Sequence, residues 1–375
     1  MMEQIFEIKP LDVLFFRDGF PFSRGENYFA RSIFPPNLST IYGALRTMIL
    51  DYKKIDLKEW LENRQTNSLI GIKDNYGSLE ITDFAIKVEN KLIYIPPIDL
   101  KLTKKDEIIK LNIKKVNISE FSNLNNIKLD IIFHTDKKFK EKKYFIGDNG
   151  LIKYLNNEEI KFNSEYIIQH LIIKDKRLGI KIDRHSQNVK EGLLYNIEYN
   201  KFIDENSSFI IKIKTDEILN LDNFIFRLGG DTKIAVIKKL NNNFNLPDFY
   251  KIQSNTNYFY LILKTPGIFP ENKFYPDCFK KNNSNELVYE NNNTKIKLIG
   301  MYIDKPKVIS GFDIANKKQK EIYKAVPEGS IYVCEILSGN IENIKNDLYP
   351  KIKVNNDKIM KEGYNLTFIK GGNIQ

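Results

Sequence analysis

The start of the chain alternates apolar and polar side chains in the manner of an extended strand. Within residues 3–17, Phe6 and Ile8 fall on one face, whereas Glu7 and Lys9 fall on the other. A period of two is typical of a β-strand, so this pattern predicts one long strand. Turn-forming residues follow it directly and mark its end.

An apolar stripe at helical spacing comes next. Asn37 and Ser39 follow two prolines and are candidate N-cap residues. The apolar positions of the stripe are Leu38, Ile41, Leu45, Met48 and Ile49. The opposite face carries Thr40, Tyr42, Gly43 and Arg46. A helix-interior glycine costs roughly 1 kcal/mol relative to alanine, so close packing on a sheet, or close approach of another molecule, would explain Gly43.

The alternating pattern returns after an irregular stretch at residues 52–170. Strands are predicted at 193–203 and 208–214, then a short helix at about 216–224. The turn Gly229–Gly230–Asp231 leads into a strand that begins at Lys233. This order of strands and helices predicts a ferredoxin-like, RRM-like domain over residues 1–243, interrupted by a large insertion at about 52–170.

A second domain is predicted at 244–375, after the polar linker LNNNFNLPD. Its expected strands lie at 257–264, 297–310, 330–337 and about 364–370, with a helix near 340–350. We interpret it as a second ferredoxin-like domain. The predicted fold class is therefore α+β, with two such domains.

The amino-acid composition limits the kinds of molecule that this protein is expected to bind. Lys and Arg number 58 against 48 Asp and Glu, and the net charge of +10 favours a polyanionic partner. The two cysteines form no CxxC pair, so neither a disulfide framework nor a cysteine zinc site is supported, and a reducing cytoplasm fits best. No run of eighteen apolar residues occurs, and the N-terminal stretch is unlike a signal peptide, so no membrane partner is expected.

Arginine is scarce and clustered in this lysine-rich chain. Seven of its eight arginines fall in three stretches, at Arg17, Arg24, Arg31 and Arg46, at Arg177 and Arg184, and at Arg227. The guanidinium is a rigid planar fork that suits phosphates and base edges, so clustering indicates specific anion contacts. Pairing with aspartate inside the fold is the alternative.

Catalytic chemistry finds little support in the sequence. The three histidines, His134, His170 and His185, are isolated, and no metal-ligand spacing or phosphate-binding glycine loop occurs. His185 and its neighbour Ser186 would point to opposite faces of an extended segment, which argues against a catalytic pair. We therefore expect no enzyme activity, no metal and no cofactor. Cleavage of RNA through its own 2′-hydroxyl with His185 acting alone stays an alternative.

Six segments in order resemble one protein family. They are RDGFPF at 17–22, FPPNLSTIYGALR at 34–46, LGIKIDRHSQNVKEGLLYNIEY at 178–199, FRLGGDTK at 226–233, KTPGIFP at 264–270 and VISGFDIANKKQKEIYKAVPEGSIYVCE at 308–335. Together they are similar to subunit three of the type III-B CRISPR Cmr effector complex, in the RAMP superfamily. Residues 52–170 add nothing to this resemblance.

The resemblance implies a non-catalytic RNA-binding subunit in defence against foreign nucleic acid. Such a subunit binds the 5′ handle of the crRNA and caps the filament of backbone subunits next to the large polymerase-like signalling subunit. The family's two ferredoxin-like domains face each other, with glycine-rich loops near RNA. The family usually closes with a turn resembling G-[FY]-G, whereas Gly363–Tyr364 is followed here by Asn365, which tolerates left-handed backbone angles.

The candidate RNA-binding residues combine the arginine clusters, the helix face and the glycine turn. They are Arg17, Asp18, Arg24, Thr40, Tyr42, Gly43, Arg46, Arg184, His185, Gly229, Gly230 and Lys233. We expect Tyr42 to present a ring to a base and the two glycines to offer N–H groups to a phosphate. Three alternatives remain: a crRNA-processing endoribonuclease of the same superfamily, the equivalent handle-binding subunit of a type III-A Csm complex, and a scaffold that touches protein only.

Overall fold

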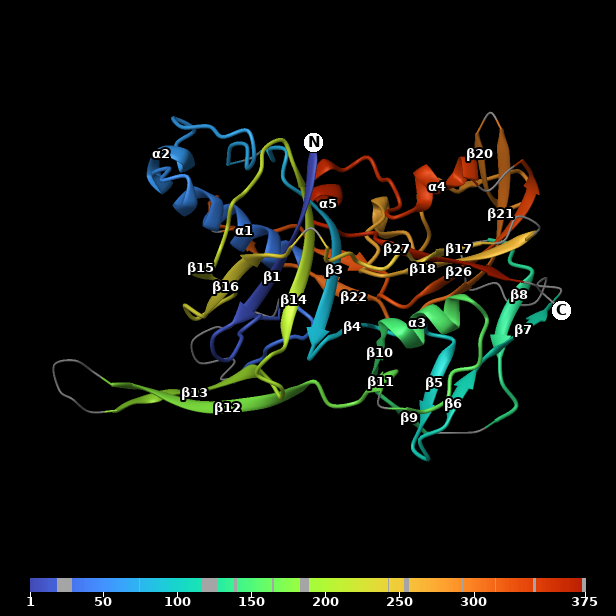
Figure 1. Ribbon diagram of the computed structural model, residues 1–375, viewed down its shortest axis with the longest axis horizontal. Helices are drawn as coiled ribbons and strands as arrows, with labels where there is room; N and C mark the ends of the chain where they lie inside the picture. Colours follow the sequence, from blue (N-terminus) through green and yellow to red (C-terminus); the bar gives the residue numbers. More distant parts are fainter. Residues whose placement is uncertain are drawn as a thin grey trace. The chain divides into compact units, whose positions relative to one another are not determined.

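The computed structural model contains mostly strands and few helices (Figure 1). It describes residues 1–18, 29–73, 75–116, 127–137, 140–163, 165–182, 189–241, 243–252, 256–291, 293–313, 315–339 and 342–372. The prediction of an α+β fold is confirmed. No helix in these ranges is long and apolar enough to cross a membrane.

The chain divides into two compact units. The first contains Met1–Glu89, His170–Phe244 and Val308–Ile322, and the second contains Asn90–Gln169, Asn245–Lys307 and Tyr323–Gln375. This division differs from the predicted domains, because residues 90–169 belong to the second unit instead of forming an insertion in the first. Packing explains the difference: the ring of Tyr94 meets Phe249 and Phe368 edge-on, at centroid distances of 5.1 and 5.6 Å.

The first unit is built on an antiparallel sheet in the order β3-β14-β1-β16-β15. Its strands are β1 (Met2–Pro10), β3 (Glu80–Val88), β14 (Ser208–Thr215), β15 (Phe224–Arg227) and β16 (Ile234–Lys239). Phe6 pairs with Ile211 and Ile8 with Phe209, and all four side chains are fully buried. β1 is shorter than predicted and ends at Pro10, which has no N–H for the ladder.

Helix α1 (Leu38–Tyr52) buries the apolar stripe that the sequence predicts. Ile41, Leu45 and Ile49 are all at most 1% exposed. A short helix, α2 (Leu57–Leu61), follows, with Asp56 accepting a hydrogen bond from the backbone N–H of Glu59 at its start. The predicted helix 38–49 is thus confirmed and extended by one turn.

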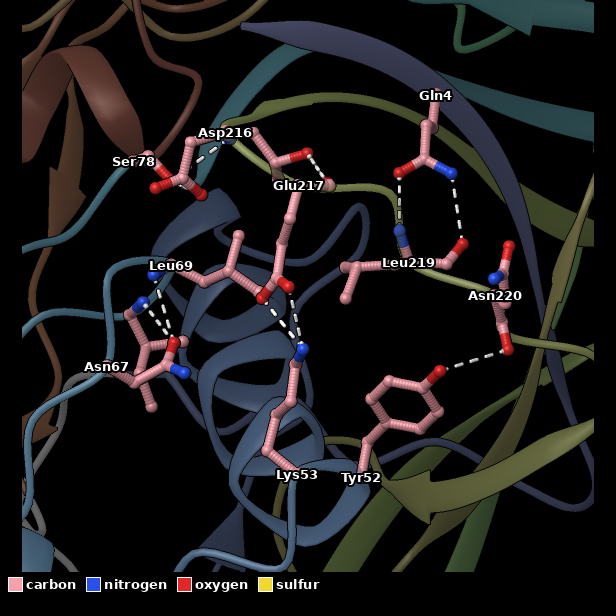
Figure 2. Close-up of polar contacts among 12 residues, drawn as sticks. Gln4, Tyr52, Lys53, Asn67, Leu69, Ser78, Asp216, Glu217, Leu219 and Asn220 are labelled. Carbon is pink, nitrogen blue, oxygen red and sulfur yellow. Dashed lines mark hydrogen bonds and ion pairs between the residues drawn. The ribbon is translucent and has the colours of Figure 1, made fainter.

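The predicted helix at about 216–224 is wrong, because this segment is irregular and is held by side chains (Figure 2). The Gln4 amide donates to the carbonyl of Leu219 at 3.0 Å and accepts from its N–H at 2.8 Å. Lys53, at the end of α1, pairs with Glu217 at 2.8 Å. Backbone groups that a helix would use internally are therefore satisfied by a residue more than two hundred positions away.

A long two-stranded ribbon also belongs to the first unit. It comprises β12 (Ile172–Ile182) and β13 (Val189–Phe202) (Figure 1). The short strand β2 (Phe29–Ala30) runs parallel to β13. The predicted strand 193–203 lies within β13. A small hairpin of β23 (Phe312–Asp313) and β24 (Lys318–Gln319) completes the described strands of this unit.

The second unit contains a seven-stranded sheet in the order β17-β27-β18-β26-β21-β20-β19. Its strands are β17 (Tyr250–Lys251), β18 (Tyr258–Leu263), β19 (Lys280–Lys281), β20 (Leu287–Asn291), β21 (Thr294–Tyr302), β26 (Ile331–Ser338) and β27 (Thr367–Gly372). Phe259, Leu261 and Cys334 lie in its core. The predicted strand 297–310 is two strands, β21 and β22 (Lys307–Ile309).

The remaining elements of the second unit are short. They are β4 (Lys91–Tyr94), β5 (Leu100–Thr103), β6 (Ile108–Lys110), β7 (Asn112–Lys115), β8 (Ile131–His134), β9 (Glu141–Lys142), β10 (Phe145–Gly147), α3 (Asp148–Leu155), β11 (Ile167–Ile168), the 3-10 turn η1 (Pro270–Asn272), β25 (Tyr323–Ala325), α4 (Glu342–Leu348) and α5 (Asp357–Lys361). Helix α4 matches the predicted helix near 340–350.

Both sheets share one strand order. Four main strands of each unit can be numbered 1 to 4 in chain order. Across the sheet they then lie in the order 4-1-3-2, as β16-β1-β14-β3 in the first unit and as β27-β18-β26-β21 in the second. Neighbours in both sets run antiparallel.

Candidate functional site

In the first unit, two cationic side chains lie against the aromatic ring of Tyr199. The guanidinium carbon of Arg177 lies 4.9 Å from the ring centroid, and the Nζ of Lys233 lies 4.8 Å from it. The Tyr199 hydroxyl donates to Asp231 at 2.7 Å, and Phe15 packs against the ring at a centroid distance of 5.5 Å. We call Asp12, Phe15, Arg177, Tyr199, Asp231 and Lys233 the Tyr199 cluster.

Carboxylates balance the cations of this cluster. Arg177 donates to Asp175 from Nε at 3.0 Å and Nη2 at 2.8 Å, and these bonds raise the pKa of its guanidinium. Lys233 lies 3.6 Å from Asp12 and 3.8 Å from Asp231. The predicted Lys233 is therefore part of a mixed-charge surface, and an incoming phosphate would compete with these carboxylates for it.

The glycine turn supports the Tyr199 cluster. Gly229 has a left-handed φ of 82°, and a Cβ there would lie 2.6 Å from the carbonyl oxygen of Phe15. The N–H of Gly230 donates to that same oxygen at 2.8 Å. The expectation that Gly230 offers this N–H to a phosphate is thus wrong for this conformation, because the carbonyl of Phe15 accepts it.

Arg17 lies next to the cluster along the chain. It forms an isolated antiparallel bridge with Ser32, and its side chain is exposed. The N–H of Asp18 donates to the carbonyl of Arg31 at 3.2 Å. The candidate residues Arg17 and Asp18 therefore both pair with the segment at residues 29–33. Asn200 fixes that segment by donating to Ser32 Oγ at 2.8 Å.

Arg46 and Tyr42 are enclosed by the loop that follows α2. Arg46 Nη2 donates to the carbonyls of Ile70 and Ile72 at 2.9 and 2.7 Å. Tyr42 is 1% exposed, donates from its hydroxyl to Leu79 at 2.9 Å and stacks on Tyr76 at 4.9 Å. The expectation that Tyr42 presents its ring to a base is therefore wrong in this conformation, because the loop covers it.

The other two candidates on α1 are accessible to different degrees. Thr40 is half-buried, whereas Gly43 is exposed. A Cβ placed on Gly43 would have no described atom within 4 Å, so packing on a sheet does not account for this glycine. Arg24, Arg184 and His185 lie outside the described residues.

The C-terminal turn adopts the backbone that the sequence predicts. Gly363 and Asn365 have left-handed φ values of 89° and 64°, which confirms that asparagine preserves the turn. Asn365 is fully buried, and its side-chain amide exchanges hydrogen bonds with the backbone of Ile268 at 2.7 and 3.3 Å. Its side chain therefore braces the neighbouring loop.

The sequence did not predict the aromatic and acidic side chains that contact Arg46 and Lys233. Tyr199, Asp231, Trp60 and Tyr76 give no signal of their own, because their roles depend on strand register and loop closure. No group of three or more His, Cys, Asp or Glu side chains in the described part of the chain could hold a metal ion.

Comparison with known proteins identifies the family. The model of the family described as CRISPR-associated protein (Cas_Cmr3) matches residues 6–370. The chain belongs to this family. A curated relative, the CRISPR system CMR subunit Cmr3 of Saccharolobus solfataricus, is 26% identical over 376 residues, covering 97% of this chain and 95% of the relative. The resemblance stated from the six sequence segments is confirmed.

Solved structures show the same fold. A chain of the type III-B Cmr-beta complex bound to cognate target RNA and AMPPnP matches with a TM-score of 0.53 and 21% identity, covering 98% of this chain and 99% of that one. A second structure of Cmr-beta bound to cognate target RNA gives a TM-score of 0.51 at 21% identity, covering 96% and 95%. The Cas_Cmr3 fold therefore extends over nearly the whole chain.

Proposed function

We propose that this chain is the third subunit of a type III-B CRISPR Cmr complex, acting in the cytoplasm in defence against foreign nucleic acid. The observation that carries the proposal is the family match over residues 6–370. A match of this extent supports extending the family's role to the entire fold. The presence of cognate target RNA in the two similar solved complexes supports a place beside RNA.

Within that complex, the chain binds the 5′ handle of the crRNA and caps the backbone filament next to the large signalling subunit. A net charge of +10 favours RNA as the partner. The exposed side chain of Arg17 and the open surface at Gly43 support contact near the first strand and helix. We rank these two exposed positions above Tyr42, which is buried, and Arg46, which is half-buried.

Two ferredoxin-like domains provide the framework. The shared strand order of the two sheets supports this proposal, since it is the order of the ferredoxin-like fold found in RNA-recognition modules. In the first unit, the irregular segment held by Gln4 takes the place of the second helix.

The test is binding of handle-bearing RNA by the assembled complex, with and without this chain. Each single-strand phosphate contact contributes roughly 0.7 to the slope of log K against log salt, so three or four contacts give a slope near −2 to −3. Duplex RNA should compete poorly. A flat salt response, with assembly intact, would support a scaffold that touches protein only.

We also propose that the chain does not cleave RNA. The sequence places no acid and base beside an activated nucleophile. Incubation of the complex with repeat RNA, with and without divalent metal, should leave the RNA intact. Cleavage that disappears in His185→Ala would establish the endoribonuclease alternative instead.

A further inference from the structure

Phe312 is an exposed aromatic ring on the β23–β24 hairpin. Its side chain is 61% exposed, more than Phe162 at 41% or Phe274 at 38%, the other phenylalanines that are largely exposed in the described part of the chain. Exposure of one apolar side chain is ordinary, so the surroundings of the ring decide what it indicates.

The hairpin holds the ring on a fixed backbone. Phe312 pairs with Gln319 and Asp313 with Lys318, and the N–H of Lys320 donates to Gly311 at 2.8 Å. Asp313 closes the turn by accepting from the backbone and side-chain nitrogens of Asn316 at 3.0 and 3.1 Å. A ring presented by a closed hairpin loses little conformational freedom when a ligand stacks on it.

The neighbours of the ring are polar. Residues paired across strands share one face, so Gln319 lies beside Phe312. Gln319 Nε2 lies 3.5 Å from Ser310 Oγ, which places the hydroxyl on that face as well. The ring is thus flanked by an amide and a hydroxyl.

Lysines lie at the turn of the hairpin and on its other face, since Lys318 pairs with Asp313 across the strands. Lys317 and Lys318 are exposed where the turn meets β24, and Lys320 is the first residue after β24. Lysine ammonium groups attract phosphates, while an aromatic ring stacks on any unpaired base. Ring, amide and ammonium groups on one small hairpin therefore suit the face of an unpaired base, its hydrogen-bonding edge and its phosphate.

We propose that Phe312 is a stacking platform for one unpaired base of single-stranded RNA, with Gln319 facing the base edge and Lys317, at the turn of the hairpin, facing its phosphate. This deepens the proposed function and rests on it, because that function supplies the RNA. The RNA is either the crRNA handle or an unpaired part of the target, which share this chemistry.

The test compares variants of the full chain in the assembled complex. Phe312→Ala should weaken binding of single-stranded RNA about tenfold, within the range of a lost base–aromatic stack. Phe312→Trp keeps a π-face and should bind like the wild type, whereas Phe312→Leu should behave like Phe312→Ala. Phe162→Ala is the matched control, removing an exposed ring from the other compact unit with no expected effect. Thermal unfolding should be unchanged in all four variants.

A second experiment identifies which base stacks on Phe312. Abasic sites are placed singly along the handle and then along the target strand, and one position should weaken wild-type binding while adding no further loss to Phe312→Ala. The strand that carries this position identifies the source of the RNA. Equal binding by wild type and Phe312→Ala, or full binding by Phe312→Leu, would overturn the stacking role alone. Absence of RNA binding by the wild-type complex would overturn the proposed function itself.

Discussion

The guanidinium carbon of Arg46 lies 4.4 Å from the centroid of the Tyr76 ring. The same guanidinium lies 5.0 Å from the ring of Trp60 and donates to two loop carbonyls. A planar cation is thus stacked and hydrogen-bonded inside the fold, where an ammonium could not reproduce both contacts.

Arg46→Lys should therefore destabilise the protein. Loss of hydrogen bonds from a charged donor costs about 1.5–3 kcal/mol, and the loop at residues 70–79 should loosen. Chemical denaturation measures the change in the free energy of unfolding. An unchanged midpoint would show that the Arg46 contacts contribute little, and the arginine would return to the list of RNA ligands.

Arg17→Lys should leave the stability of the protein unchanged and weaken its binding of RNA. Its side chain is exposed, so the unfolding free energy should stay within about 0.5 kcal/mol of the wild-type value. Binding of handle RNA should nevertheless weaken, by about 1.5–3 kcal/mol if the planar fork binds a phosphate bidentately. Parallel titrations of Arg17→Lys and Arg46→Lys separate the two roles, and equal affinity of Arg17→Lys and wild type would remove Arg17 from the site.

Gly43→Ala should stabilise the protein while impairing RNA binding. Alanine is favoured over glycine in a helix by up to about 1 kcal/mol, and a Cβ at this position meets no described atom. If RNA approaches the helix here, the added methyl group should weaken its binding. The matched change, Gly229→Ala, should destabilise by 1 kcal/mol or more, on the order expected for a left-handed backbone and a clash with Phe15. A stable Gly43→Ala variant with full RNA affinity would contradict contact at this helix.

The buried Lys370 should give the second unit a pH-dependent stability. Burial, helped by the nearby ammonium of Lys110, lowers the pKa of Lys370 to about 6, against the opposing attraction of Asp99. The rings of Tyr154 and Tyr260 face it, with centroids 3.8 and 5.6 Å from its Nζ. Burial also raises the pKa of Asp99, which accepts from the Tyr154 hydroxyl.

Where Lys370 is neutral in the folded chain and charged in the unfolded chain, the unfolded chain binds one more proton there, so this lysine makes stability rise with pH. Asp99, whose pKa is raised, has the opposite effect at pH values below its own folded pKa, so the rise is expected on the alkaline side. One such proton contributes a slope of at most about 1.4 kcal/mol per pH unit. Lys370→Met should flatten the dependence between pH 7 and pH 9.5 and stabilise most at the lower end. The exposed Lys324→Met is the control. An identical slope in Lys370→Met and wild type would show that the folded protein keeps this lysine charged.

Local periodicity was enough to predict the scaffold of the first unit. The helix stripe of Ile41, Leu45 and Ile49 and the strand at 208–214 depend on neighbours in sequence, and both are present. The helix expected at 216–224 is absent because Gln4 bonds the backbone of Leu219, a contact that no local pattern reports.

The site was less predictable for the same reason. Arg177 and Lys233 meet at Tyr199 only once β12 and β13 pair in their observed register. Tyr42 occupies the polar face of α1 in the sequence pattern, yet a loop ending at Leu79 covers it. Helix amphipathicity reports which face a helix buries on its sheet, and it does not report what a distant loop does to the other face.

The most direct test of the central claim is purification of the tagged chain from its native host, followed by identification of the co-purifying proteins and sequencing of the bound RNA. The account predicts type III-B Cmr subunits, including the large signalling subunit, and RNAs that share one repeat-derived 5′ end. RNA without a common 5′ end, or a complex that contains type III-A Csm subunits, would contradict it.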